Sequence, residues 1–397
     1  MSTHPLAGSR LYDDLLVDLA YEYDLSLPQA RSLADLGHDA VHPGSAPEAH
    51  TALADPHVAT TYIDSFIKVT GMEPGVWLLD AQAARVLDGD GDNAGVRYLL
   101  ARVAELRGQL DRWRTQLDLS LALDDGYEPS LFDRGFLAFV EGDVSTATRL
   151  LGRIDDPRAA VMLHTLSHYP PRRSGSGRNY PCQCGSGAKT KRCCGVVPEP
   201  HPLHERVYWL WEKTAWWLRR PPQQWALLDL VAELADVEEV DDDLEAVTEV
   251  LHEEATEAIA LLDADLVSWF VDTLGSLLPT DERGLLTEWV GTRHRLWRVE
   301  ATDPGRSVTM VDDDTGRRVE AMNGSVSRCT QPGEIVFAAV VPTSAGWFLP
   351  CHHLGVASSS APLVASWMDD FDDPLNVAAH LYSGIRRPPS DDCGEPE

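Results

Sequence analysis

The chain has 397 residues, of which 44% are hydrophobic and 24% are charged, and its formal net charge is −30. This length supplies apolar material for two or three cores, and the acidity excludes a protein that coats nucleic acid with its whole surface, because phosphate binding needs a basic footprint. No apolar run approaches the roughly 20 residues that cross a bilayer, and the acidic N-terminus lacks the basic and apolar regions of a signal peptide, so we expect a soluble, cytoplasmic protein with no membrane partner.

Residues 1–168 are expected to form a helical domain. Leucines at helical spacing favour helix over residues 9–70. Within that span, the stretch from Leu36 to Pro56 is rich in Gly, Pro, His and Ala, which predicts a loop.

Residues 95–154 contain a repeat with a period of 34 residues, the period of tetratricopeptide repeats. Gly108 and Gly142 are one period apart, as are Ala104 and Ala138. Each unit predicts two helices joined by a short turn. The four predicted helices are Val96–Arg107, Leu110–Leu121, Ser130–Glu141 and Val144–Ile154.

The second repeat unit carries more of the tetratricopeptide pattern than the first. Gly135, Ala147 and Leu151 supply two small residues and one bulky residue where two helices must approach and interlock. Two units are too few for a solenoid that stands alone, so we expect them to stack on flanking helices. A generic pair of helical hairpins is the alternative.

A small module over residues 172–198 is set off by two breaks in composition, Tyr169–Gly177 and Val197–Pro202. Four of the seven cysteines lie in it, within thirteen residues: Cys182, Cys184, Cys193 and Cys194. A long chain without a signal peptide is not a disulfide scaffold, so this concentration favours metal binding.

The spacing of these cysteines suits a closed tetrahedral site. Two sulfurs come from a Cys-x-Cys turn and two more from an adjacent Cys-Cys pair eight residues later. Four thiolates favour Zn²⁺ and leave no open position for a catalytic water, so the site is interpreted as structural. Iron is a competing metal. A redox-active pair, or a chance cluster, is the alternative interpretation.

Segment Gly177–Gly195, with the sequence GRNYPCQCGSGAKTKRCCG, resembles the SEC-C motif, the small zinc-binding module best known at the C-terminus of the SecA translocation ATPase. The resemblance covers about nineteen residues and implies that the four clustered cysteines are the metal ligands. Because the module of SecA contacts an acidic chaperone, it also implies a protein partner. Gln183, Ala188 and Thr190 depart from the usual pattern, and Cys194 stands where SecA has His. The chain has no phosphate-binding loop, so no ATPase motor is implied.

A basic island surrounds the cysteines, since no acidic residue occurs from Pro157 to Pro198. On so acidic a chain the island predicts a docking face for an acidic partner, either a protein surface or nucleic acid. A solvated loop that balances the charge of the metal centre is the alternative. Besides Arg158, the island contains the six residues to which we assign partner binding: Arg172, Arg173, Arg178, Lys189, Lys191 and Arg192.

Residues 203–292 are predicted to be a second helical region with an acidic surface. Apolar residues from Val207 to Trp217 recur at helical spacing, and the tryptophans among them favour a core role. From Pro221 to Glu282 there are 18 acidic residues and no Lys or Arg. The apolar periodicity continues through this stretch, so we expect a folded acidic surface and not a disordered tail.

The pattern changes to strands over residues 293–355. Strands are predicted around Leu296, Val308 and Val319 and over Ile335–Val341, with turn sequences between them. We expect a small antiparallel β module of about five strands. Residues 356–397 are predicted to contain a short helix near Pro374–Leu381 and a mobile tail.

The remaining groups of candidate metal-binding or catalytic residues are weaker evidence for a functional site. A possible second metal site is ranked below a simple cluster at the end of a strand. Its residues are Cys351, His352, His353 and Cys329. His164 and His168 are one helical turn apart but have no acidic companion. No hydrolase, dinucleotide or metalloprotease motif occurs, so no catalytic residue is assigned.

The expected fold class is mainly α and multidomain, and the expected function is a non-enzymatic, metal-binding adaptor for protein–protein interaction. The first alternative is a nucleic-acid- or ribosome-associated protein that uses the basic island. A second is an acidic nucleic-acid mimic that uses Pro221–Glu282, including Asp241, Asp242 and Asp243. A third is an enzyme of unrecognised type. A small-molecule substrate is not assigned.

Overall fold

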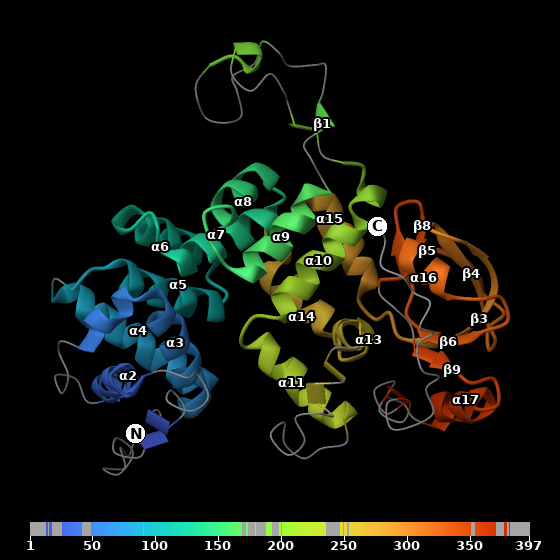
Figure 1. Cartoon of the computed structure of the whole chain (residues 1–397), viewed down its shortest axis with the longest axis horizontal. Helices are drawn as coiled ribbons and strands as arrows, with labels where there is room; N and C mark the ends of the chain where they lie inside the picture. The colour runs from blue at the N-terminus through green and yellow to red at the C-terminus, as the bar shows by residue number, and fades with distance from the viewer. Residues whose placement is uncertain are drawn as a thin grey trace. The chain divides into compact units, whose positions relative to one another are not determined.

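The structure is a computed structural model that is mainly helical, with a small mixed sheet towards the C-terminus (Figure 1). The chain divides into two compact units, residues 1–170 and 171–397. Among the described residues, no helix is both long and apolar enough to cross a membrane. The structure describes residues 13–14, 16–17, 26–41, 49–89, 91–168, 172–173, 179, 188–192, 198–199, 201–235, 247–248, 250–251, 254–350, 354–370, 377–378 and 381.

The first unit is a series of antiparallel helices, each packed against the next along the chain, as the blue-to-green ribbon shows (Figure 1). The elements are α2 (Leu27–Val41), η1 (Ala49–Ala54), α3 (Pro56–Thr70), α4 (Met72–Asp88), α5 (Ala94–Leu106), α6 (Leu110–Leu123), α7 (Glu128–Glu141), α8 (Val144–Leu151) and α9 (Pro157–Ser167).

The prediction of a loop from Leu36 to Pro56 is wrong for the parts of this stretch that the structure describes. Helix α2 continues to Val41, and Ala49–Ala54 forms a short 3₁₀ helix. Leu36, Ala40 and Leu53 are buried, so packing overrides a composition that by itself favours a loop. Helix α3 then begins at a cap, where the Asp55 carboxylate accepts hydrogen bonds from the amides of the first turn.

The four helices predicted over the repeat are confirmed as α5 to α8. The first helix of each pair also ends in the same way. Gly108 and Gly142 have φ of +67° and +80°, and the amide after each glycine donates to the carbonyl of Ala104 or Ala138. The repeat in the sequence is therefore a repeat in helix termination, of the left-handed glycine type.

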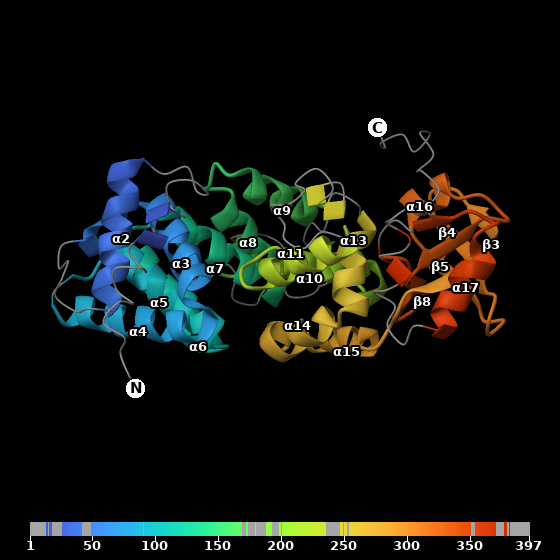
Figure 2. The same ribbon diagram turned by 90° about the horizontal axis from the view of Figure 1, so that it is seen from below.

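The helical part of the second unit is built around the tryptophan-rich helix α10, as the sequence predicts. Trp211 and Trp217 are buried, and the Trp217 ring meets Trp269 and Phe270 edge to face at 5.3 and 5.4 Å. Helices α14 and α15 lie side by side (Figure 2). The elements are η3 (Leu203–Glu205), α10 (Val207–Leu218), α11 (Gln223–Leu234), α13 (Glu254–Ala258), the π-helix η4 (Ile259–Asp263), α14 (Leu266–Leu274), η5 (Gly275–Leu277) and α15 (Thr280–Trp289).

The predicted antiparallel module of about five strands is wrong in strand number and in pairing. The sheet has seven strands in the order β7-β8-β5-β4-β3-β6-β9, and β5 pairs parallel with β8. The run Ile335–Val341 forms two strands instead of one. The strands are β3 (Arg295–Asp303), β4 (Ser307–Asp312), β5 (Arg318–Met322), β6 (Ile335–Ala338), β7 (Val341–Thr343), β8 (Gly346–Phe348) and β9 (Leu354–Val356).

One face of the sheet forms its own core, in which side chains such as Val299 and Val319 alternate with exposed neighbours. Helix α16 (Gly324–Cys329), which was not predicted, packs on β3 and β4. Helix α17 (Ala361–Asp370) precedes the position where a C-terminal helix was expected. Most of that expected segment and the predicted tail lie outside the described residues.

Candidate functional site

The four predicted metal ligands, Cys182, Cys184, Cys193 and Cys194, lie outside the described residues, and so does Arg178. The described parts of the module are its two ends and one turn. Strand β1 (Arg172–Arg173) pairs antiparallel with β2 (Pro198–Glu199), with Arg172 opposite Glu199. The ladder therefore pairs the two residues that precede the cysteine segment with the two that follow it.

Three cations of the predicted partner surface lie on the described turn between these two strands. Lys189, Lys191 and Arg192 are exposed. Thr190–Arg192 forms the 3₁₀ turn η2, in which the Arg192 amide donates to the Lys189 carbonyl at 2.7 Å. None of the three forms an ion pair with the described part of the chain.

Arg158, by contrast, does not belong to the free positive charge of the basic island. Its guanidinium lies 2.7 Å from the Asp156 carboxylate, and this hydrogen-bonded partner raises the pKa of Arg158 and lowers the pKa of Asp156. Asp156 is also the N-cap of α9. The ion pair is thus part of the start of that helix.

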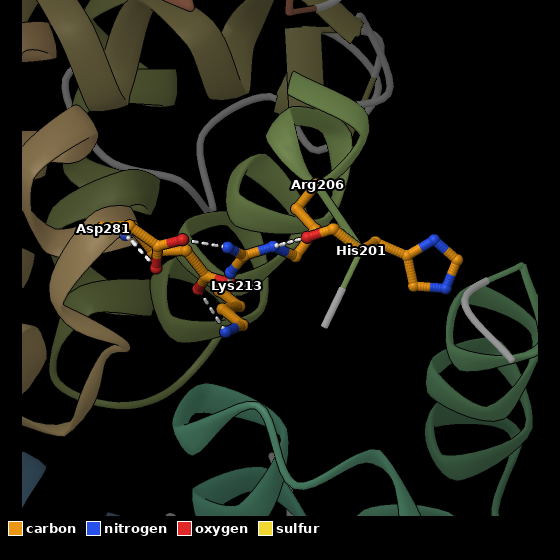
Figure 3. Close-up of polar contacts among 5 residues, drawn as sticks. His201, Arg206, Lys213 and Asp281 are labelled. Carbon is orange, nitrogen blue, oxygen red and sulfur yellow. Dashed lines mark hydrogen bonds and ion pairs between the residues drawn. The ribbon is translucent and has the colours of Figure 1, made fainter. Parts of the chain in front are cut away.

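A largely buried ion cluster joins the start of α10 to the start of α15 and consists of Arg206, Lys213, Asp281 and Glu282 (Figure 3). Arg206 contacts both carboxylates through its two terminal nitrogens, and its Nε donates to the His201 carbonyl at 2.7 Å. The Lys213 ammonium lies 2.6 Å from Glu282 Oε2. The cluster joins the chain that leaves β2 to the first turn of α15.

The cluster is electrically balanced, and its pair Lys213–Glu282 is shielded from solvent. Lys213 is 0% exposed and Glu282 1%, and the Lys213 Nζ lies 4.7 Å from the centre of the Trp209 ring. Burial lowers the pKa of Lys213, and the adjacent Glu282 opposes that shift. Both acids are in the first turn of α15, where the helix dipole favours negative charge. A fully enclosed ammonium has no access to a substrate, so the cluster acts as a structural brace.

The sequence interpretation missed this brace and placed Glu282 at the edge of an acidic surface. The signal available was Lys213 itself, a cation in the middle of a helix that is mainly apolar and rich in tryptophan. Such a residue needs a buried partner. Asp263 was misplaced in the same way, since it is also buried. The predicted acidic surface over Pro221–Glu282 therefore loses two of its carboxylates to the interior.

Asp263 forms a second buried polar contact, with His294. The His294 amide donates to Asp263 Oδ1 at 2.9 Å, and its ring nitrogen Nδ1 contacts Oδ2. The imidazole stacks on Phe337, with ring centres 5.1 Å apart. Asp263 ends the π-helix η4, and His294 lies just before β3. This pair therefore ties the helical part of the second unit to its sheet.

The cluster suggested at Cys351, His352 and His353 lies outside the described residues. Cys329, its proposed companion, is disulfide-bonded. A sulfur in a disulfide is not a thiolate ligand. Within the described ranges, no group of three or more His, Cys, Asp or Glu side chains is placed to hold a metal ion.

No protein-family model matches the chain. No solved structure matches it either. The resemblance to the SEC-C motif rests on the residues of segment Gly177–Gly195 alone.

Proposed function

We propose that the chain is a non-enzymatic adaptor of the cytoplasm that docks an acidic protein partner through a metal-stabilised module. Cys182, Cys184, Cys193 and Cys194 bind one structural Zn²⁺, or iron in its place. The docking surface is made by Arg172, Arg173, Arg178, Lys189, Lys191 and Arg192.

The observation that carries the proposal is the β1–β2 ladder, which pairs the residues on either side of the cysteine segment. A segment of this size buries little apolar surface, so it needs another source of stability. Structural zinc supplies about 10–16 kcal/mol to small zinc-binding peptides. The spacing of the cysteines and the paired strands that flank the segment are both suited to such a site.

The exposed cations on η2 support the docking role. Lys189, Lys191 and Arg192 project from one short turn and have no acidic partner in the described part of the chain. On a protein of net charge −30, a local positive surface selects acidic partners and repels the protein's own acidic regions.

Metal content and partner capture test the proposal together. We expect one metal atom per chain in the wild type and none in Cys182→Ser/Cys193→Ser, which should also fail to capture the partner from native lysate. A partner that is captured equally well without the metal would remove the docking role of the module.

A charge-reversal variant separates the metal from the docking surface. Lys189→Glu/Lys191→Glu/Arg192→Glu should keep the metal and lose the partner. The matched control reverses three exposed arginines elsewhere, Arg149, Arg283 and Arg306, and should keep both. If both triple variants lose the partner to the same extent, net charge, and not this surface, governs binding.

The same cations also fit the second candidate, a contact with nucleic acid. In that case RNA or DNA would be recovered with the wild type, and its binding would weaken as salt is raised, because phosphate contacts release counterions. Capture of a protein partner that persists after nuclease treatment favours the adaptor.

A further inference from the structure

His164 and His168 form an exposed pair at the end of α9 that neither the brace nor the cysteine module uses. They lie one helical turn apart and are in edge-to-face contact, with ring centres 4.7 Å apart and ring planes at 81°. Two histidines at this spacing on one helix face are an arrangement by which proteins bind transition metals.

The hydrogen bonding at His168 prepares one ring nitrogen for coordination. Its Nδ1 lies 3.0 Å from the carbonyl oxygen of His164. A carbonyl oxygen has no proton to give, so Nδ1 is the donor. In the neutral ring, Nε2 then keeps its lone pair. Metal-binding histidines are commonly oriented in this way, by a hydrogen bond that the other ring nitrogen donates to an acceptor.

The position at the helix end favours a cation as well. α9 ends at Ser167, and His168 is its C-cap. Partial negative charge gathers at the C-terminus of a helix. The nearest described cation on the same helix, Arg158, is at the opposite end and is paired with Asp156. The helix end therefore favours a bound metal ion, whereas the cations of the basic island that follows His168 oppose it.

We propose that His164 and His168 form a two-imidazole site for a divalent transition metal such as Cu²⁺, Ni²⁺ or Zn²⁺. Imidazole suits these ions, whereas Mg²⁺ and Ca²⁺ prefer oxygen ligands. Among the described residues no third ligand joins the pair, so the other coordination positions are filled by water or by another molecule. The site is separate from the proposed cysteine centre and does not depend on it.

The test is to add Cu²⁺ below one equivalent to the full-length protein and follow the ring signals of its histidines by nuclear magnetic resonance. The signals of His164 and His168 should broaden first. His57, an exposed histidine without a neighbouring imidazole on α3, is the internal control. If the three signals broaden together, the pair is not a site.

Substitution supplies the quantitative measurement. In His168→Ala the selective broadening at His164 should disappear, and the affinity for Ni²⁺ at the pair should fall by about tenfold or more, since even the loss of an outer-shell partner costs about 10–100-fold. Because both rings are exposed, the helix should persist, which circular dichroism checks. His57→Ala should bind as the wild type does. Unchanged affinity in His168→Ala would overturn the proposal.

Discussion

Lys213 shows how a charged residue is kept inside the protein on a mainly apolar helix. One helical turn away from it on α10 lie Trp209, Leu210, Trp216 and Trp217, and it is 0% exposed. A charge in such a place is stable only when a partner of opposite charge is also buried and hydrogen-bonded. Glu282 is that partner, 69 positions away along the chain.

The brace predicts a large effect for one carboxylate and a small one for its neighbour. Glu282→Gln removes the negative charge shared by Lys213 and Arg206, so the free energy of unfolding should fall by about 3–5 kcal/mol. Asp281→Asn is the control, because its side chain is 49% exposed and such pairs contribute about 1 kcal/mol or less. Urea denaturation of both variants measures the difference.

A second substitution shows whether charge is the cause. Lys213→Met in the Glu282→Gln background removes the ammonium that was left without its partner, and stability should partly return. If the double variant is less stable than Glu282→Gln alone, the loss comes from packing and not from an uncompensated charge.

At the scale of elements, the contact between α7 and α8 depends on Gly135. A Cβ at this position would lie 2.8 Å from Cγ and Cδ2 of the buried Leu151. The sequence singled out both residues as a small and a bulky partner, and the structure confirms that they meet. The close approach of these two helices therefore requires a residue without a side chain.

We expect Gly135→Ala to destabilise the first unit by about 1–3 kcal/mol through overpacking. The control is Gly284→Ala, also within a helix, where an added Cβ has no atom within 4 Å. That variant should gain about 0.5–1 kcal/mol from helix propensity. Thermal unfolding measures both changes, and a loss of stability in both variants would contradict the packing argument.

At the scale of the whole molecule, each unit encloses its own core. Tyr62, Trp113 and Phe136 are fully buried in the first unit, and Phe270 and Trp297 in the second. Compact units that have their own cores are commonly the cooperative units of unfolding.

Calorimetry of the full chain should therefore show two unfolding transitions. Gly135→Ala should lower the temperature of one transition and Glu282→Gln that of the other. Each kcal/mol corresponds to roughly 2–4 °C for units of this size. One transition shifted by both variants would mean that the units unfold together.

Local pattern accounts for what the sequence predicted well. The helices α5 to α8 and α10 follow from apolar spacing, glycine and capping residues within a few positions of one another. The loop from Leu36 to Pro56 was wrong because burial of Leu36 and Leu53 outweighed local composition. The parallel pairing of Ala321 with Trp347 was not predictable, because turn sequences report only on adjacent strands.

By itself, the sequence determined a mainly helical chain with a repeat of 34 residues, a tryptophan-rich helix and a C-terminal sheet. It also supplied the cysteine cluster on which the proposed function rests. Only the tertiary structure decided which charges are buried, how seven strands are ordered, and that β1 and β2 pair on either side of the cysteine segment. The physical reason is range: helix periodicity acts over one or two turns, whereas burial and strand pairing join residues that only the folded chain brings together.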